Sequence, residues 1–268
     1  FREFVEELAD NQYVPLRFKN HVEIPNINPR DGEGVDEKKV DPELAAAALD
    51  YLRTYHYASV EHVAVEIMCA SGPRQSDLRA LDVEDHTTTS ENILSFLHRD
   101  ETTLKKDSAS NRKNKYWSDV QRIIDDYLTN KRTETTDENG RRPLLTKGDG
   151  RIAESTLRKT AYKWTRPCAV GLDCPHDRDV ESCDAAQSNN DAFRCPSSRA
   201  THHFRKGFIT DQRNKGVSQE AIEHRCDVSP ATQRIHYDLP DEDQERKRYE
   251  SEFESANQPE ESGSGFNP

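Results

Sequence analysis

Long apolar runs are missing from this sequence. No stretch comes near the roughly 18 consecutive apolar residues that a membrane-spanning helix needs, and the first residues do not show the charged-then-apolar pattern of a secretory signal. These absences exclude a helical membrane protein as the class of this chain. We therefore expect a soluble protein of the cytoplasm, with no membrane as a partner.

Apolar residues are scarce overall. They make up 32% of the 268 residues, against 33% for charged residues, and there is a single Met. This apolar share is low for a globular protein, although the length is enough for one large domain or two small ones. We therefore expect an economical core, with part of the chain in loops or tails.

Cysteine is too sparse for a disulfide scaffold. There are six in the chain, and four of them fall in one irregular stretch, residues 167–198: Cys168, Cys174, Cys183 and Cys195. Such a loop builds little core of its own, so a tetrahedral zinc ion held by these thiols is one interpretation, with His176 as a substitute ligand. No Cys-x-x-Cys pair supports it, and reduced structural thiols are the alternative.

Positive charge is in deficit. The net charge is −12 and the isoelectric point about 5.4, whereas DNA-binding proteins usually carry a basic footprint. That argument against DNA assumes ordinary salt. In molar salt the Debye length falls to about 3 Å, so a diffuse acidic surface barely repels DNA while clustered arginines still bind it. The composition fits a salt-adapted cytoplasm, and equally a merely acidic soluble protein.

Helix-start signals are present along most of the chain. Asp41-Pro42-Glu43 has the order of an N-cap, a first-turn proline and a first-turn acid. Ser59 caps a second, apolar helix that ends at Gly72-Pro73. The same signals predict further helices from about residues 118, 155, 201, 218, 230 and 241.

Strand signals are few. Ile93, Phe96 and Leu97 are typical of a strand, and the Lys-rich stretch from Lys105 to Lys115 is typical of a hairpin. The sequence therefore predicts a mainly α fold with a small β-sheet or hairpin.

Three stretches carry side chains suited to phosphate chemistry. Residues 71–85 place Arg74 just after the break at Pro73, and residues 202–207 read His-His-Phe-Arg-Lys-Gly at the start of a helix. Residues 227–237 form a short Ser-Pro-initiated helix that a tyrosine closes. Planar guanidinium groups neutralise phosphate oxygens bidentately, so Arg74 and Arg205 are candidate phosphate ligands; ordinary surface ion pairs are the alternative.

In order and spacing, these stretches resemble the arginine box, the His-x-x-Arg box and the nucleophilic tyrosine of the tyrosine recombinases, the phage integrase family. The resemblance covers about residues 41–250 and is greatest to integrase-like proteins of salt-loving archaea. It implies a DNA recombination and integration enzyme that binds double-stranded DNA, breaks and rejoins strands through a 3′-phosphotyrosyl link, and needs no cofactor for this chemistry. It also implies a homo-tetramer on paired sites.

The resemblance assigns roles to individual residues. Tyr237 would be the nucleophile, Arg74 and Arg205 would hold the scissile phosphate, and His202, one helical turn before Arg205, would assist proton transfer. A hairpin lysine would protonate the departing 5′ oxygen. Lys105 is preferred for this role, with these competitors: Lys106, Lys113 and Lys115.

Asp227 departs from the family pattern, which often has a histidine or tryptophan at this position. An anionic side chain would repel the phosphate unless it is rotated away or held by Arg225, and His236 and Lys206 are nearby cations that could compensate. Two alternatives to the recombinase stay open, and the departure at Asp227 favours the first of them. One is a binding-only regulator that has lost turnover, and the other is an enzyme like the type IB topoisomerases that relaxes supercoils.

The resemblance also divides the chain. We expect a remnant of a preceding helical DNA-clamping domain, a linker, a catalytic domain with the Cys-rich insertion at 167–198, and a disordered tail. In order, these are residues 1–25, 26–40, 41–253 and 254–268.

Overall fold

The computed structural model describes residues 2–15, 36–87 and 91–257. The chain divides into two compact units, Phe1–Asp36 and Glu37–Pro268. The first contains helix α1 (Arg2–Asp10). The predicted division at residues 25 and 40 stays a prediction, because most of the predicted linker and the tail beyond residue 257 lie outside the described residues.

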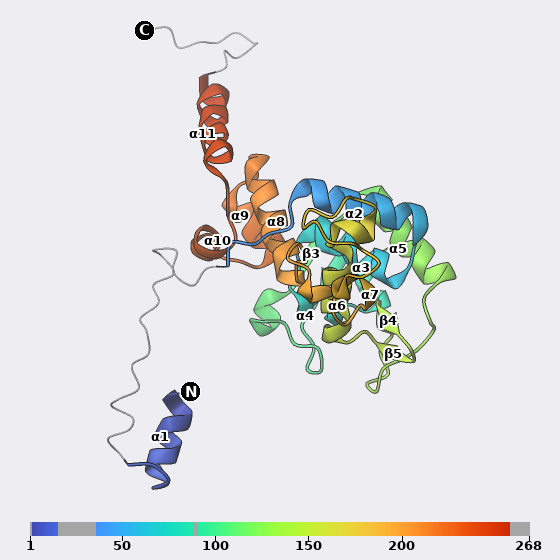
Figure 1. Ribbon diagram of the computed structural model, residues 1–268, viewed down its shortest axis with the longest axis vertical. Helices are drawn as coiled ribbons and strands as arrows, with labels where there is room; N and C mark the ends of the chain where they lie inside the picture. The colour runs from blue at the N-terminus through green and yellow to red at the C-terminus, as the bar shows by residue number, and fades with distance from the viewer. Residues whose placement is uncertain (1, 16–35, 88–90, 258–268) are drawn as a thin grey trace. The chain divides into compact units, whose positions relative to one another are not determined.

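The second unit is mainly helical (Figure 1). Its described helices are α2 (Pro42–Tyr55), α3 (Val60–Ser71), α4 (Gln75–Ala80), α5 (Ser118–Asn130), α6 (Glu154–Trp164), α7 (Asp184–Gln187), α8 (Thr201–Asn214), α9 (Gln219–Cys226), α10 (Pro230–His236) and α11 (Glu242–Asn257). Short 3₁₀ turns include η4 (Asp107–Ser110), η5 (Pro167–Val170) and η6 (Ala192–Arg194). Across the described parts of the chain, every helix is too short or too polar to span a lipid bilayer.

Two small antiparallel sheets accompany the helices. The larger has the order β1-β2-β3, formed by β1 (His86–Thr87), β2 (Ile93–Phe96) and β3 (Arg112–Lys115). β2 and β3 are the predicted hairpin, with Phe96 paired to Arg112. β4 (Thr146–Lys147) and β5 (Gly150–Arg151) form the other. The predicted fold class, mainly α with a small sheet, is confirmed.

Local capping explains several helix ends. The Ser59 side chain accepts a hydrogen bond from the backbone N–H of His62, and Gly72 ends α3 in the left-handed conformation that glycine adopts without strain. α6 begins at Glu154 rather than at Ser155, a shift within the usual variation of helix ends. α11 runs to Asn257, so residues 254–257 are helical although they were predicted to belong to the disordered tail.

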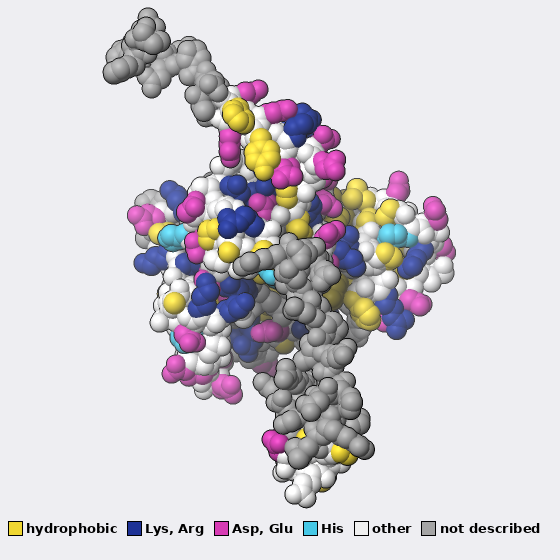
Figure 2. All heavy atoms as spheres, turned by 90° about the vertical axis from the view of Figure 1, so that its left-hand side faces the viewer, with side chains coloured by type: hydrophobic (Ala, Val, Ile, Leu, Met, Phe, Trp, Pro, Cys, Tyr) yellow, Lys and Arg dark blue, Asp and Glu magenta, His cyan; other side chains and the backbone are white. Residues whose placement is uncertain are grey.

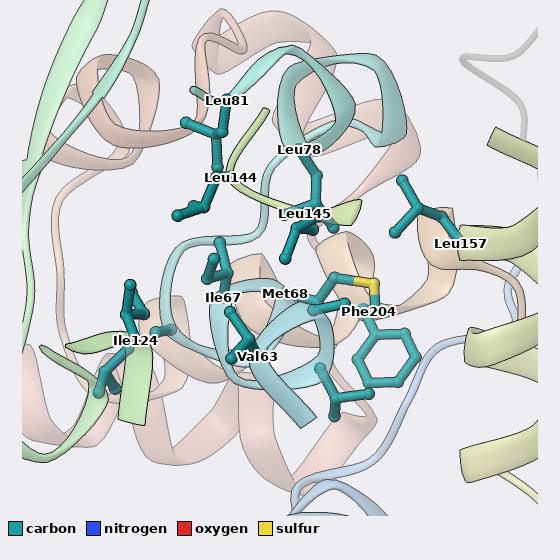
Figure 3. Close-up of a cluster of buried hydrophobic side chains, with 14 of the residues drawn as sticks. Val63, Ile67, Met68, Leu78, Leu81, Ile124, Leu144, Leu145, Leu157 and Phe204 are labelled. Atoms are coloured by element: carbon teal, nitrogen blue, oxygen red, sulfur yellow. The ribbon is translucent and has the colours of Figure 1, made fainter. Parts of the chain in front are cut away.

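Helix α3 forms the centre of the core. Val63, Ile67 and Met68 are fully buried, and α3 packs against α2, α5, α6 and α8. Figure 3 shows these side chains meeting Leu78 and Phe204 from other elements. Fully burying a side chain of this size contributes about 1.5–3 kcal/mol, so a helix that is apolar on most faces is stable only at the centre of the unit.

The chain that enters the unit is bound to α8. The backbone N–H of Val40 donates to the carbonyl of His203 (3.0 Å), and the Lys39 ammonium donates to the carbonyl of Leu239 (2.6 Å). Gly207 permits this approach, because a Cβ atom there would lie 2.1 Å from the Val40 oxygen. Any larger residue at 207 would push the Lys39–Val40 segment away from α8.

Candidate active site

The structure brings four of the predicted site residues together. Arg205, on α8, donates from Nη1 to the carbonyl of Gly72 (2.8 Å), two residues before Arg74. The Arg205 guanidinium carbon lies 5.1 Å from the centre of the Tyr237 ring, and the His202 and Tyr237 ring centres are also 5.1 Å apart. Segments widely separated in the sequence therefore form one cluster of cations around a phenol.

Arg205 is the least solvated of these groups. Its exposed fraction is 0%, and its Nε and Nη2 atoms are buried with no hydrogen-bond partner in the described part of the chain. Burial lowers the pKa of this guanidinium. Nε and Nη2 form the edge of the guanidinium that grips an oxyanion with two parallel bonds. This unpaired edge, called the Arg205 fork below, costs free energy to bury, and a phosphate group would accept hydrogen bonds from both of its nitrogens.

Tyr237 follows the last residue of α10 and lies beside the Arg205 fork. The Ser229 hydroxyl caps the start of α10 by accepting from the N–H of Thr232, and the Tyr237 N–H donates to the carbonyl of Gln233 (3.0 Å). The Tyr237 carbonyl accepts from the Thr210 hydroxyl of α8 (2.9 Å). These bonds fix the backbone of the tyrosine relative to α8, and its side chain is 9% exposed.

Arg74 is already bound to an anion of the same chain. Its Nη1 donates to the Asp227 carboxylate and its Nη2 to the Asp227 carbonyl, both at 2.5 Å. Asp227 also accepts from the Lys106 ammonium and the Ser110 hydroxyl, each at 2.8 Å. Arg225, one of the partners considered for Asp227, donates from its guanidinium to backbone carbonyls instead.

Three donors control the charge of Asp227. Partial burial tends to raise its pKa, but hydrogen bonds from Lys106, Ser110 and Arg74 outweigh burial and hold the pKa at about 2. Because this value lies below the ordinary aspartate pKa of about 3.9, the stabilisation is present above about pH 4 and is lost as the pH falls toward 2. Neutral solution therefore leaves the Asp227–Arg74 pair intact.

The hairpin places Lys106 in the cluster. Lys105 is exposed and makes no hydrogen bond to Asp227, whereas the Lys106 ammonium reaches it across η4. On β3, Lys113 and Lys115 occupy the exposed positions. The choice of Lys105 as proton donor stays a prediction, and the geometry favours Lys106.

A buried ion pair that was not predicted from the sequence lies next to the site. Arg112 of β3 donates from Nη2 to the Asp77 carboxylate (2.7 Å), and both side chains are almost fully buried. Its Nε also donates to the carbonyl of Arg225 (2.9 Å), two residues before Asp227. The pair joins the hairpin to α4 and to the end of α9. A signal was present, since Arg112 falls on the inward-facing positions of a strand that alternates between buried and exposed residues.

The remaining predicted residues lie near the cluster or apart from it. His203 accepts a hydrogen bond at Nδ1 from the backbone N–H of Ala200 (2.9 Å), so its side chain stabilises the first turn of α8. Lys206 is buried and His236 half-buried. The predicted zinc ligands form a separate group of side chains around a small cavity: Cys168, Cys174, Cys183 and Cys195.

Solved structures match this arrangement of elements. A crystal structure of XerA recombinase aligns with a TM-score of 0.58 at 14% identity, over 91% of this chain and 72% of that chain. A structure of the Tn1549 transposon integrase in complex with transposon right end DNA aligns with a TM-score of 0.58 at 13% identity, over 94% and 84%. The chain has the catalytic-domain fold of the tyrosine recombinases.

A lambda integrase dimer bound to a core site aligns more weakly, with a TM-score of 0.50 at 10% identity over 99% of this chain and 60% of that chain. No family model matches the sequence, and no curated protein matches it. At such identities the comparison establishes the recombinase fold. The fold does not establish the activity, which depends on the cluster of Arg74, His202, Arg205 and Tyr237. The resemblance to proteins of salt-loving archaea stays a prediction.

Proposed function

We propose that this chain is a site-specific DNA recombinase that breaks and rejoins strands through a 3′-phosphotyrosyl link to Tyr237. The observation that carries the proposal is the buried, unpaired guanidinium edge of Arg205 beside that tyrosine, inside a recombinase fold. A phosphodiester supplies what the site lacks, an anion with two oxygens to pair with the fork.

The proposed reaction balances without an added reactant. The Tyr237 hydroxyl oxygen attacks phosphorus, the bond from phosphorus to the 5′ oxygen breaks, and the 3′ phosphate stays on the tyrosine. His202 takes the phenolic proton, and Lys106 gives a proton to the departing 5′ oxygen. Arg74 and Arg205 neutralise the non-bridging oxygens. The phosphotyrosyl link keeps the energy of the broken bond for rejoining, so the chemistry draws on neither ATP nor a metal ion.

The DNA partner fits the charge distribution around the site. Figure 2 shows Lys and Arg side chains across the middle of the face that carries α9 and α10, although the chain is acidic overall. A hollow beside β3 is lined by Lys113, Lys115 and Arg225, next to a Trp117 side chain that is 61% exposed. Cations beside an exposed aromatic ring suit a nucleic-acid backbone. We further propose action in the cytoplasm as a homo-tetramer on paired sites.

A nicked suicide substrate tests the proposal directly. When cleavage falls just upstream of the nick, the short 5′-hydroxyl fragment diffuses away and the protein stays on the DNA as an adduct that survives denaturation. We expect this adduct in high salt. If no adduct forms on any DNA that the protein binds, the proposed strand-cleaving activity is refuted. A junction of defined sequence supports recombination, whereas relaxation of any supercoiled plasmid indicates a topoisomerase.

A binding-only regulator is the second candidate, and one observation favours it. Asp227 occupies both Nη atoms of Arg74 with its carboxylate and its carbonyl. A phosphate must displace these contacts before Arg74 can act on it. If displacement is too costly, the protein binds DNA and turns over slowly or not at all.

Replacing Asp227 with Asn is expected to raise the rate of adduct formation roughly tenfold. Two like charges about 5 Å apart repel by about 3 kcal/mol at an effective dielectric constant of about 20, and part of this gain is lost with the bonds to Lys106 and Ser110. Asn suits the position because residue 227 has a φ of 52°, a left-handed conformation that Asn tolerates. Single-turnover cleavage on the suicide substrate measures the change.

Asp238→Asn is the matched control. It also removes a negative charge close to Tyr237, but Asp238 pairs with Arg248 and Arg213 and leaves Arg74 untouched. We expect its rate to stay near that of the unmodified protein. An Asp227→Asn protein that is folded yet no faster would show that Asp227 does not restrain Arg74.

DNA affinity is expected to fall with added salt less steeply than for a basic protein of this size. Each neutralised phosphate adds about −0.9 to the slope of log affinity against log salt concentration. An acidic surface offers few cationic side chains, so few phosphates are neutralised. Titrations across a range of salt concentrations give the slope. A value as steep as about −9, equivalent to roughly ten phosphates, would contradict this account of the negative charge.

A further inference from the structure

The segment between α6 and α8 has almost no core of its own. Its buried apolar side chains are small, and they are Val170, Ala185 and Ala192. Its larger apolar side chains are exposed, namely Leu172, Val180 and Phe193. About 30 residues with so little apolar burial need another source of stability, such as a crosslink or a metal ion.

Four thiols of this segment line one cavity. Cys168 lies in η5, Cys183 precedes α7 as its N-cap, Cys195 follows η6, and Cys174 lies in the irregular stretch between η5 and α7. All four are half-buried free thiols, and together with His176 they surround a cavity of about 10 Å³. Each short turn of the segment thus contributes a thiol to a common centre.

Two cations lie beside the same four thiols. The cavity is also lined by Arg166 and Arg178. Four thiolates around a divalent ion carry a net charge of about −2, which these two guanidinium groups would offset.

The donor set fits zinc in kind and in number. Structural zinc sites take four ligands in a tetrahedron, and four cysteines are one of their usual sets. Within residues 2–15, 36–87 and 91–257, no three His, Cys, Asp or Glu side chains stand ready in a metal-holding arrangement. Binding therefore requires the thiols to turn inward about their Cα–Cβ bonds, which half-buried side chains of an irregular segment can do.

We propose that Cys168, Cys174, Cys183 and Cys195 bind one structural zinc ion that fixes the segment leading into α8. His176 is not a ligand in this proposal, because four thiolates already complete a tetrahedral set; its Nε2 lies 2.8 Å from the Ser197 hydroxyl. The segment closes on α6 through the backbone N–H of Arg199, which donates to the Thr165 hydroxyl (2.7 Å), two residues before α8 begins. Zinc would thereby steady the helix that carries His202 and Arg205.

Elemental analysis of the reduced, full-length protein, purified without added metal, tests the site. The expected content is about one zinc per chain. A mercurial that blocks thiols is expected to release that zinc as four thiols react, which tests the unmodified protein even if variants fold poorly. A content below about 0.2 zinc per chain, with all four thiols freely titratable, would overturn the proposal. Two disulfides found by mass spectrometry would overturn it as well.

Variants identify the ligands. Cys174→Ser and Cys195→Ser are expected to lose the zinc, whereas Cys69→Ser and His176→Ala keep it, since Cys69 lies on α3 outside the segment. Substituted cobalt is expected to give the visible absorption of a tetrahedral thiolate site. Zinc that survives Cys174→Ser but not His176→Ala would refute the four-thiolate set.

The coupling to α8 has its own readout. Chelated protein is expected to keep its helical circular dichroism and to form the DNA adduct severalfold more slowly, with recovery on adding zinc. Unchanged adduct formation after complete zinc removal would refute the coupling while leaving the site intact. The metal content is measured without DNA, so a failure of the proposed recombinase activity would not be mistaken for a failure of the zinc site.

Discussion

Replacing Tyr237 with Phe is expected to abolish the covalent protein–DNA adduct, with folding and DNA affinity nearly unchanged. The substitution removes one hydroxyl and keeps the ring that packs beside His202 and Arg205. A phenol with a pKa near 10 is a poor nucleophile at neutral pH, so the attack depends on a phosphate that the two arginines have already polarised. We expect the adduct to fall by at least about a thousandfold on the suicide substrate.

Tyr249→Phe is the control for this experiment. Tyr249 lies on α11 with its side chain 57% exposed, and its hydroxyl donates to Glu245 in the same helix (3.3 Å). A solvated phenol that donates to a carboxylate is not activated as a nucleophile, so its loss is expected to leave the adduct at its normal level. An adduct that persists in Tyr237→Phe and disappears in Tyr249→Phe would reassign the nucleophile.

Arg205→Met is expected to slow cleavage strongly while leaving the protein as stable as before or more stable. The arginine is fully buried, and only its Nη1 has a partner among the described residues. A buried charge with unpaired donors is unfavourable to folding, and an apolar side chain of similar length removes that cost. Loss of a charged phosphate ligand is expected to slow cleavage by about a hundredfold to a thousandfold.

Arg112→Met provides the contrast. Arg112 is also buried, but it is paired with Asp77, whose side chain is 0% exposed. Removing the arginine leaves that carboxylate buried without its strongest partner and only 3.9 Å from the Arg74 guanidinium, and breaking a buried pair in this way costs up to about 3–5 kcal/mol. Thermal melting of the two variants should therefore move in different directions. If Arg205→Met were as destabilising as Arg112→Met, Arg205 would be a structural residue rather than a phosphate ligand.

Local chemistry made much of the fold predictable. The Ser59 cap, the glycine that ends α3 and the Ser-Pro start of α10 depend on a few adjacent residues, and the structure has all three. The strand at Ile93 and the starts of helices α8 to α10 were predicted to within a residue or two, whereas β3 covers only the end of the predicted hairpin stretch from Lys105 to Lys115. The family motifs then pointed to Arg74, Arg205 and Tyr237, which the structure brings into one cluster.

Contacts between distant segments were not predictable in the same way. The preference for Lys105 over Lys106 depended on the hairpin register, and the irregular turn at η4 intervenes between the strands. Asp227 and Arg74 are 153 positions apart in the sequence, and no local sequence pattern predicts an ion pair between them. Arg225, close to Asp227 in the sequence, was considered as its partner, but the Arg225 guanidinium donates to backbone carbonyls.

The bonds of Val40 to α8 and of Lys39 to the residues after α10 set a limit for protein engineering. The Val40 N–H and the Lys39 ammonium hold the chain against His203, one residue after His202, and against Leu239, two residues after Tyr237. A graft that joins this unit to a foreign DNA-binding module at residue 41 would remove both bonds and leave the Gly207 face of α8 bare. Fusion points should therefore lie before Lys39. Movement of the attached module is then resisted by the Lys39 and Val40 hydrogen bonds and does not disturb the cluster around Tyr237.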